Sequence, residues 1–180
     1  MNNTELHPVV EAAARDAELP AWARCKPDRR AHCVRVGELL SDWAGDLGLP
    51  DRDVARWRAT GVLHDALKDA DPDELEGLVA ETWPPPVVHG PACAARLRAD
   101  GVEDPAMLAA IAYHPVGHPD LDALGRFLIM ADFLDPGRSF RSDERQQLRD
   151  RLPAEADSVL AEVLALRMQK LLKKRRAMLA

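Results

Sequence analysis

The chain has few cysteines and no pattern that would pair them. Its 180 residues include only Cys25, Cys33 and Cys93, and they form no CxxC pair. An odd number without such a pair indicates neither a disulfide framework nor a zinc ribbon, so we expect reduced thiols. His89 and Cys93 are four residues apart and could share a helix face around zinc. Nothing else completes that site, and packing in the core is the simpler interpretation of Cys93.

Membrane-spanning segments and a nucleic-acid-binding charge pattern are also lacking. No apolar stretch approaches the length that crosses a bilayer, and residues 1–5 do not begin a basic segment followed by an apolar one, so we expect a soluble, cytoplasmic protein. The net charge of −6 argues against general affinity for nucleic acid, because binding to the phosphate backbone depends on concentrated Lys and Arg. The one dense basic run, residues 170–176, is interpreted as a solvated helix face. A tail that binds a partner or RNA is the alternative.

Strand patterns are almost absent. Ala, Leu, Arg and Glu dominate the segments between Pro and Gly breaks, which is typical of helices. With 47% hydrophobic and 30% charged residues, the chain can bury the core of one globular domain. We therefore expect a compact, all-α bundle of about eight or nine helices over residues 1–180, with a core motif region at 28–140 and a C-terminal helical extension at 141–180. The expected helices cover residues 7–19, 28–47, 51–65, 71 to a break at 82–86, 92–100, 105–114, 121–134, 142–151 and 154–178. His89 is expected in the loop before the fifth of these helices.

Five of the six histidines fall in one ordered series with two aspartates. The series is His32, His64, Asp65, His89, His114 and Asp132. Imidazole and carboxylate together suit first-row transition metals, and a carboxylate can bridge two ions. Several members follow apolar runs, where an ionised carboxylate costs several kcal/mol unless it is paired or metal-bound. Each histidine alone would be interpreted as a core or capping residue, but the set predicts a metal site.

The order of these residues resembles a known family. His32, then His64-Asp65, then Asp132 resembles the HD-domain superfamily of metal-dependent phosphohydrolases, an all-helical fold named for the adjacent His-Asp pair. The intervening His89 and His114 are similar to the two extra histidines of its dinuclear members. The flanking motifs resemble the YqeK-like branch, the symmetrical bis(5'-nucleosyl)-tetraphosphatases: Arg29, the run 61–68, His89-Gly90, the run 110–114 and the run 131–138.

The resemblance implies two divalent metal ions bridged by Asp65. The other ligands it implies are His32, His64 and Asp132 on one ion, and His89 and His114 on the second. Iron is the first choice by analogy, with manganese or another divalent ion as the alternative. Such a pair of ions can lower the pKa of a shared water and neutralise charge on the attacked phosphorus, so phosphoanhydride hydrolysis is the natural reaction class.

Three further residues are candidates for contact with substrate phosphates. Lys68 is expected near Asp65 on a helix, where it could assist departure of a phosphate leaving group; we assign Asp65 and Lys68 catalytic roles. Lys68 could instead be a surface lysine that pairs with a neighbouring aspartate. Arg138 offers a planar fork for a phosphate oxygen, or it braces the turn that precedes it. His118 stands near the position where YqeK-like proteins show arginine, and it is a shorter donor whose charge depends on pH; a place near the metals or in an exposed loop is the alternative.

The favoured function is metal-dependent cleavage of diadenosine tetraphosphate-like dinucleotides into two nucleoside diphosphates by a metal-activated water. Pro115 and His118 depart from the His-Thr and Gly-Arg of the YqeK-like pattern, which leaves open an HD phosphohydrolase that acts on other nucleotides or phosphoesters. A non-catalytic metal- and nucleotide-binding regulatory protein is the third hypothesis. The segment before Cys25 and the final helix are expected to cover the fold or to contact a second subunit in a homodimer.

Overall fold

Within residues 5–178, the part of the chain that a computed structural model describes, all regular structure is helical, so the expected all-α fold is confirmed. Side chains are described through residue 172. The nine helices of this part are α1 (Pro8–Asp16), α2 (Pro27–Asp46), α3 (Asp51–Leu63), α4 (Pro72–Glu76), α5 (His89–Ala99), α6 (Pro105–Tyr113), α7 (Ala123–Leu134), α8 (Ser142–Asp150) and α9 (Ala156–Met178). No helix here is both long enough and apolar enough to cross a membrane.

Aspartates before several helices explain where those helices start. Asp71 precedes Pro72 at the start of α4, and Asp104 precedes Pro105 at the start of α6. Each aspartate accepts a hydrogen bond from a backbone N–H of the first turn, which has no partner inside the helix. Proline is suited to the first helical position because its fixed φ matches the helix. Both expected helix starts are confirmed.

Several expected boundaries were wrong, among them the end of the first helix, which lies at Asp16 and not at residue 19. α5 begins at His89 instead of Ala92. Gly90 and Pro91 lie in its first turn, where proline is tolerated because backbone N–H groups there have no partner within the helix. His89 is therefore a helical residue and not a loop residue. α3 ends at Leu63, and tight turns follow in which Lys68 N–H donates to the Asp65 carbonyl at 3.0 Å. Lys68 is thus near Asp65 through a turn and not along a helix, and α4 ends at Glu76, well before the 82–86 break.

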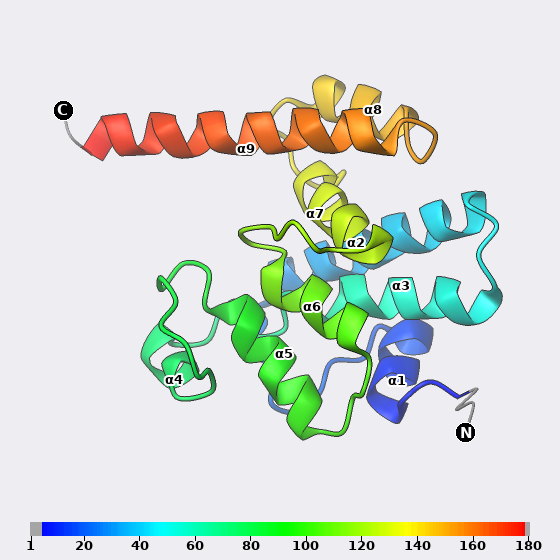
Figure 1. Ribbon diagram of the computed structural model, residues 1–180, viewed down its shortest axis with the longest axis vertical. Coiled ribbons are helices and arrows are strands. Elements are labelled where there is room, and N and C mark those ends of the chain that lie inside the picture. Colours follow the sequence, from blue (N-terminus) through cyan, green and yellow to red (C-terminus); the bar gives the residue numbers. More distant parts are fainter. Residues whose placement is uncertain (1–4, 179–180) are drawn as a thin grey trace.

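The helices pack around α2, α3 and α7. α2 and α3 approach closely at Gly37 and Gly61, where a Cβ built on Gly61 would lie 2.6 Å from Gly37 Cα. The Phe127 ring of α7 packs between Trp43 of α2 and Trp57 of α3, with ring centroids 5.8 and 5.2 Å away. α7 lies between these helices and α9, which runs across one end of the molecule, while α1 packs on α3 at the other end (Figure 1). The close α2–α3 contact brings His32 of α2 near His64, which directly follows α3; their ring centroids are 5.4 Å apart.

The long helix α9 is only partly covered. Val159 and Val163 are fully buried near its start. Four apolar side chains farther along remain exposed: Leu164, Met168, Leu171 and Leu172. The C-terminal half of α9 extends beyond α7 (Figure 1). The start of α9 therefore belongs to the core, and the stretch 164–172 exposes four apolar side chains.

Candidate metal centre

The ends of five helices bring the six expected ligands together. His32 lies on α2 and Asp132 on α7, whereas His64 and Asp65 follow α3, His89 opens α5 and His114 directly follows α6. The five side chains other than Asp132 are at most 5% exposed. Two groups of side chains could each hold a metal ion, with ligand atoms within 4.8 Å of one another: His32, His64 and Asp132, and His64, Asp65 and His114. We call these six residues the His/Asp cluster.

The carboxylate of Asp65 lies between the two halves of the cluster. Its Oδ2 atom is 3.6 Å from His64 Nε2 and 4.0 Å from His32 Nε2. Its Oδ1 atom is 3.1 Å from His89 Nε2 and 3.3 Å from His114 Nε2. One oxygen thus faces each half, which is the geometry a bridging carboxylate requires.

Hydrogen bonds on the far side of three rings orient their Nε2 atoms into the cluster. His64 Nδ1 donates to the Gly61 carbonyl at 2.6 Å, and His114 Nδ1 donates to the Ile111 carbonyl at 2.8 Å. A carbonyl only accepts, so in these two rings the proton is on Nδ1 and the lone pair is on Nε2. Partners of this kind fix the tautomer of metal-binding histidines. Each bond spans three residues, so the local turn of the chain sets the ring orientation.

The third ring, His32, is oriented by a residue whose role the sequence did not reveal. His32 Nδ1 lies 2.8 Å from Asp135 Oδ2. Asp135 is 1% exposed and accepts two bonds from Arg35, at 2.6 and 3.0 Å, and one from the Gly137 N–H at 2.9 Å. From the sequence, Asp135 was predicted only as part of the turn before Arg138. Asp135 follows Asp132 by three residues, and Arg35 follows His32 by three. Because residues three apart share a helix face, this spacing was the available indication that Asp135 and Arg35 lie beside the ligands.

The pKa shifts suit metal binding. Burial opposes ionisation of Asp65, but His64 and the neighbouring rings outweigh it and hold the Asp65 pKa well below its usual range. Burial lowers the pKa of His64 to about 4, and burial also lowers the pKa of His89. Burial opposes protonation of His32, but its hydrogen bonds to Asp132 and Asp135 outweigh it and raise the His32 pKa. At neutral pH the ionised Asp65 carboxylate therefore lies beside the neutral imidazoles of His64 and His89, and imidazole with carboxylate suits a transition-metal ion.

Among the described residues, three inward-facing atoms of the cluster have no hydrogen-bond partner, although other nitrogen and oxygen atoms of the cluster lie close to them. His32 Nε2, His64 Nε2 and Asp65 Oδ1 are buried and make no hydrogen bond. Each such atom costs about 1–3 kcal/mol when nothing compensates for its lost water. Their convergence means that a cation within the cluster would satisfy them together. The residues therefore fit a metal ion.

Comparison with known proteins identifies the family. The model of the HD domain family matches residues 29–166. The chain belongs to the HD domain family. An HD superfamily structure agrees with this fold: a protein from Clostridium acetobutylicum, described as a predicted HD superfamily hydrolase involved in NAD metabolism, superposes with a TM-score of 0.64 at 23% identity, covering 82% of this chain and 78% of that one.

Three curated relatives carry the name symmetrical bis(5'-nucleosyl)-tetraphosphatase. The protein from Staphylococcus aureus is 29% identical over 123 residues, which are 63% of this chain and 62% of the relative. The proteins from Halalkalibacterium halodurans and Bacillus subtilis are each 28% identical, over 65% and 68% of this chain and 66% and 69% of their own lengths. The match thus spans slightly less than two thirds of the first two relatives. The resemblance to the YqeK-like branch of the HD family is confirmed.

Three cationic side chains surround the cluster of this HD domain. Lys68 Nζ lies 3.3 Å from the Pro86 carbonyl and 3.3 Å from each ring nitrogen of His89. Burial lowers the pKa of Lys68. Arg138 donates to Asp132 at 2.7 Å. Arg29, for which the sequence predicted no chemical role, donates to Asp65 Oδ2 at 2.9 Å. Its place three residues before His32 in the family motif was the only indication in the sequence.

The third expected phosphate contact, His118, lies outside the cluster. Its ring stacks at 4.7 Å on that of Tyr113, and its Nδ1 accepts a hydrogen bond from the Asp120 N–H at 3.2 Å. The loop between His114 and His118 is anchored to α9. Arg167 of α9 donates to the His114 carbonyl at 3.2 Å and to the Pro115 carbonyl at 2.7 Å. Arg167 therefore satisfies carbonyls that the end of α6 leaves without partners. No feature of the local sequence pointed to it.

Proposed function

We propose that this HD domain is a metal-dependent phosphohydrolase that cleaves diadenosine tetraphosphate-like dinucleotides symmetrically into two nucleoside diphosphates. The observation that carries the proposal is the Asp65 carboxylate, whose two oxygens face opposite halves of a buried imidazole cluster. The name shared by the three curated relatives supports the substrate.

The cluster would hold two divalent ions. His32, His64, Asp65 and Asp132 would hold one ion, and His89 and His114, together with Asp65, would hold the other. Iron is the first candidate and manganese the second, since imidazole and carboxylate suit both. When bound, such ions lower the pKa of a shared water and neutralise charge on the attacked phosphorus.

The cations of the chain would bind and orient the polyphosphate. Lys68 lies beside His89, and Arg138 lies beside Asp132, so the two halves of the cluster each have a cation next to them. Arginine offers several N–H donors in a plane, which suits phosphate oxygens. A positive charge on both sides favours a substrate centred on the cluster. Hydrolysis then breaks the bond from the central bridging oxygen to one phosphorus, and that oxygen leaves with one nucleoside diphosphate.

Lys68 is proposed to act at the leaving group. Its ammonium lies against His89, and its pKa is lowered by burial, so it releases a proton more readily than an exposed lysine. Donation to the departing phosphate oxygen would stabilise the charge that develops there.

Product analysis tests the proposal. The purified protein, with its metal content measured, is incubated with diadenosine tetraphosphate beside the Asp65→Ala variant. ADP as the sole product, lost in the variant, is expected. Formation of AMP and ATP would contradict symmetrical cleavage, and an intact dinucleotide under iron and manganese supplementation would refute the substrate. Metal-replete protein that binds nucleotide without turnover would favour the regulatory hypothesis.

Hydrolysis of other nucleotides or phosphoesters is the second candidate. Pro115 supplies neither a hydroxyl nor a backbone N–H, and His118 stacks on Tyr113 instead of reaching the cluster. Contacts to phosphate in this loop are thus reshaped relative to the YqeK-like pattern. A panel of nucleoside mono-, di- and triphosphates, compared by kcat/KM with the dinucleotide, separates the two candidates.

The exposed half of α9 supports the homodimer. Leu164, Met168 and Leu171 recur at helical spacing on it. Light scattering should show a dimer that Met168→Glu dissociates and Gln169→Glu leaves intact; a monomeric wild type would refute this assembly.

A further inference from the structure

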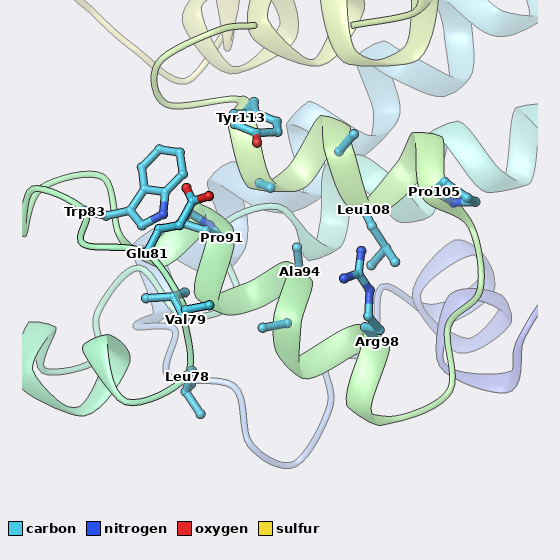
Figure 2. A pocket seen from close by; sticks show the side chains of 14 residues that line it. Leu78, Val79, Glu81, Trp83, Pro91, Ala94, Arg98, Pro105, Leu108 and Tyr113 are labelled. Atoms are coloured by element: carbon cyan, nitrogen blue, oxygen red, sulfur yellow. The ribbon is translucent and has the colours of Figure 1, made fainter. Parts of the chain in front are cut away.

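A cavity of about 430 Å³ lies between α5, α6 and the segment that follows α4. None of the six cluster residues lines it. Four alanines of α5 and α6 contribute small side chains to its wall: Ala94, Ala95, Ala109 and Ala112. Small residues on two neighbouring helices leave a shallow apolar floor (Figure 2). Such a floor suits a flat ring better than a branched or charged group.

Aromatic side chains gather at one end of this cavity. The Trp83 and Tyr113 rings are 5.9 Å apart and tilted by 56°. Figure 2 shows Glu81 beside Trp83 at this end, with Arg98 at the other. Aromatic faces attract planar π systems, and a carboxylate accepts hydrogen bonds but repels phosphate. The cavity therefore suits a neutral aromatic ring that carries N–H donors on its edge.

The aromatic end is built by the same segments that carry the His89 half of the cluster. Tyr113 directly precedes His114. The segment that contains Trp83 continues to Pro86, whose carbonyl accepts a hydrogen bond from Lys68 at 3.3 Å. Lys68 in turn lies against His89. A ligand with its ring on Trp83 and its anionic part at Lys68 would thus contact a segment and a side chain that are joined through the Pro86 carbonyl.

We propose that this cavity is the purine subsite of the enzyme. One base of the substrate stacks at Trp83 and Tyr113, its amino group donates to Glu81, and its polyphosphate extends toward Lys68. The inference rests on the proposed function for the phosphates, but base binding itself requires no catalysis.

The test uses adenosine, which has a base and no phosphate. We expect saturable binding of adenosine to the metal-loaded protein by calorimetry, weakened at least about fivefold by Trp83→Ala, because one base–aromatic stack contributes about 1–3 kcal/mol. Trp83→Phe should retain binding. In hydrolysis of diadenosine tetraphosphate, Trp83→Ala should raise KM by a similar factor and leave kcat nearly unchanged.

Two further variants test whether adenosine binds in this cavity. Ala95→Leu narrows the floor without removing an aromatic ring and should also weaken adenosine binding. Trp22→Ala is the matched control, since this partly buried tryptophan donates to Asp100 at 2.6 Å, outside the cavity, and should leave binding unchanged. Absence of adenosine binding, or binding that Trp83→Ala and Ala95→Leu do not alter, overturns the subsite even if ADP is formed. Adenosine binding that depends on Trp83, without ADP formation, supports the subsite and overturns the proposed reaction alone.

Discussion

Replacing Asp135 by asparagine should weaken metal binding although Asp135 is not itself an expected ligand. Asp135 accepts from His32 Nδ1 at 2.8 Å, so it fixes the ring whose Nε2 faces the cluster. Carboxylates behind metal-binding histidines typically contribute 10–100-fold to metal affinity, or about 1.4–2.7 kcal/mol. An amide would keep one acceptor oxygen but lose the negative charge that supports the imidazole.

The same change should also destabilise the fold. Asp135 accepts four hydrogen bonds, from His32, from Arg35 twice and from Gly137. An amide presents an NH₂ group where some of these donors point, so at least one buried donor loses its partner at a cost of about 1–3 kcal/mol. Urea unfolding of the metal-free protein measures this loss separately from metal binding.

Metal affinity is best measured by competition with a chromophoric chelator at constant pH, using manganese to avoid oxidation. Asp120→Asn serves as the control, because Asp120 is exposed beside His118 and outside the cluster. A roughly 10–100-fold loss in Asp135→Asn alone is expected. Affinity equal to that of the wild type would show that His32 needs no support from Asp135 and would refute the reasoning.

Three other predictions concern single contacts. Lys68→Met should lower kcat while metal content by mass spectrometry stays that of the wild type; metal loss would contradict its assigned role. Gly90→Ala should cost about 1–3 kcal/mol in urea unfolding, because its Cβ would lie 2.7 Å from the Ala112 carbonyl oxygen, whereas Gly45→Ala, with nothing within 4 Å, should not destabilise. Burial opposes ionisation of Asp104, but Arg56 outweighs it and lowers the Asp104 pKa. The ionised Asp104 carboxylate therefore adds its full stability above pH 3.8, the ordinary pKa of aspartate. This stability is lost as the pH falls through the lowered pKa of Asp104 in the folded protein. The stability difference between wild type and Asp104→Asn should shrink across that window, and a constant difference would contradict the assignment.

Local chemistry made part of this molecule predictable. The aspartate–proline pairs at Asp71 and Asp104 indicated helix starts, because capping and the fixed φ of proline act within one turn. His64 and His114 could be placed near the core because each ends an apolar run, and their orienting carbonyls lie only three residues back. Helix boundaries were harder to predict, as at His89. Gly and Pro are tolerated both in the first turn of a helix and in a loop, so they do not distinguish the two.

Contacts between distant segments could not be predicted from the same patterns. Asp135 meets His32 across 103 residues, and Arg167 meets the His114 carbonyl across 53. Only the packing of α7 on α2 and of α9 on α7 creates these pairs. The second pair also holds the turn that follows α6, because the guanidinium of Arg167 donates to the carbonyls of His114 and Pro115. The position of His114 therefore depends on a helix outside the core motif region, so the C-terminal extension contributes to the geometry of the cluster as well as covering α7.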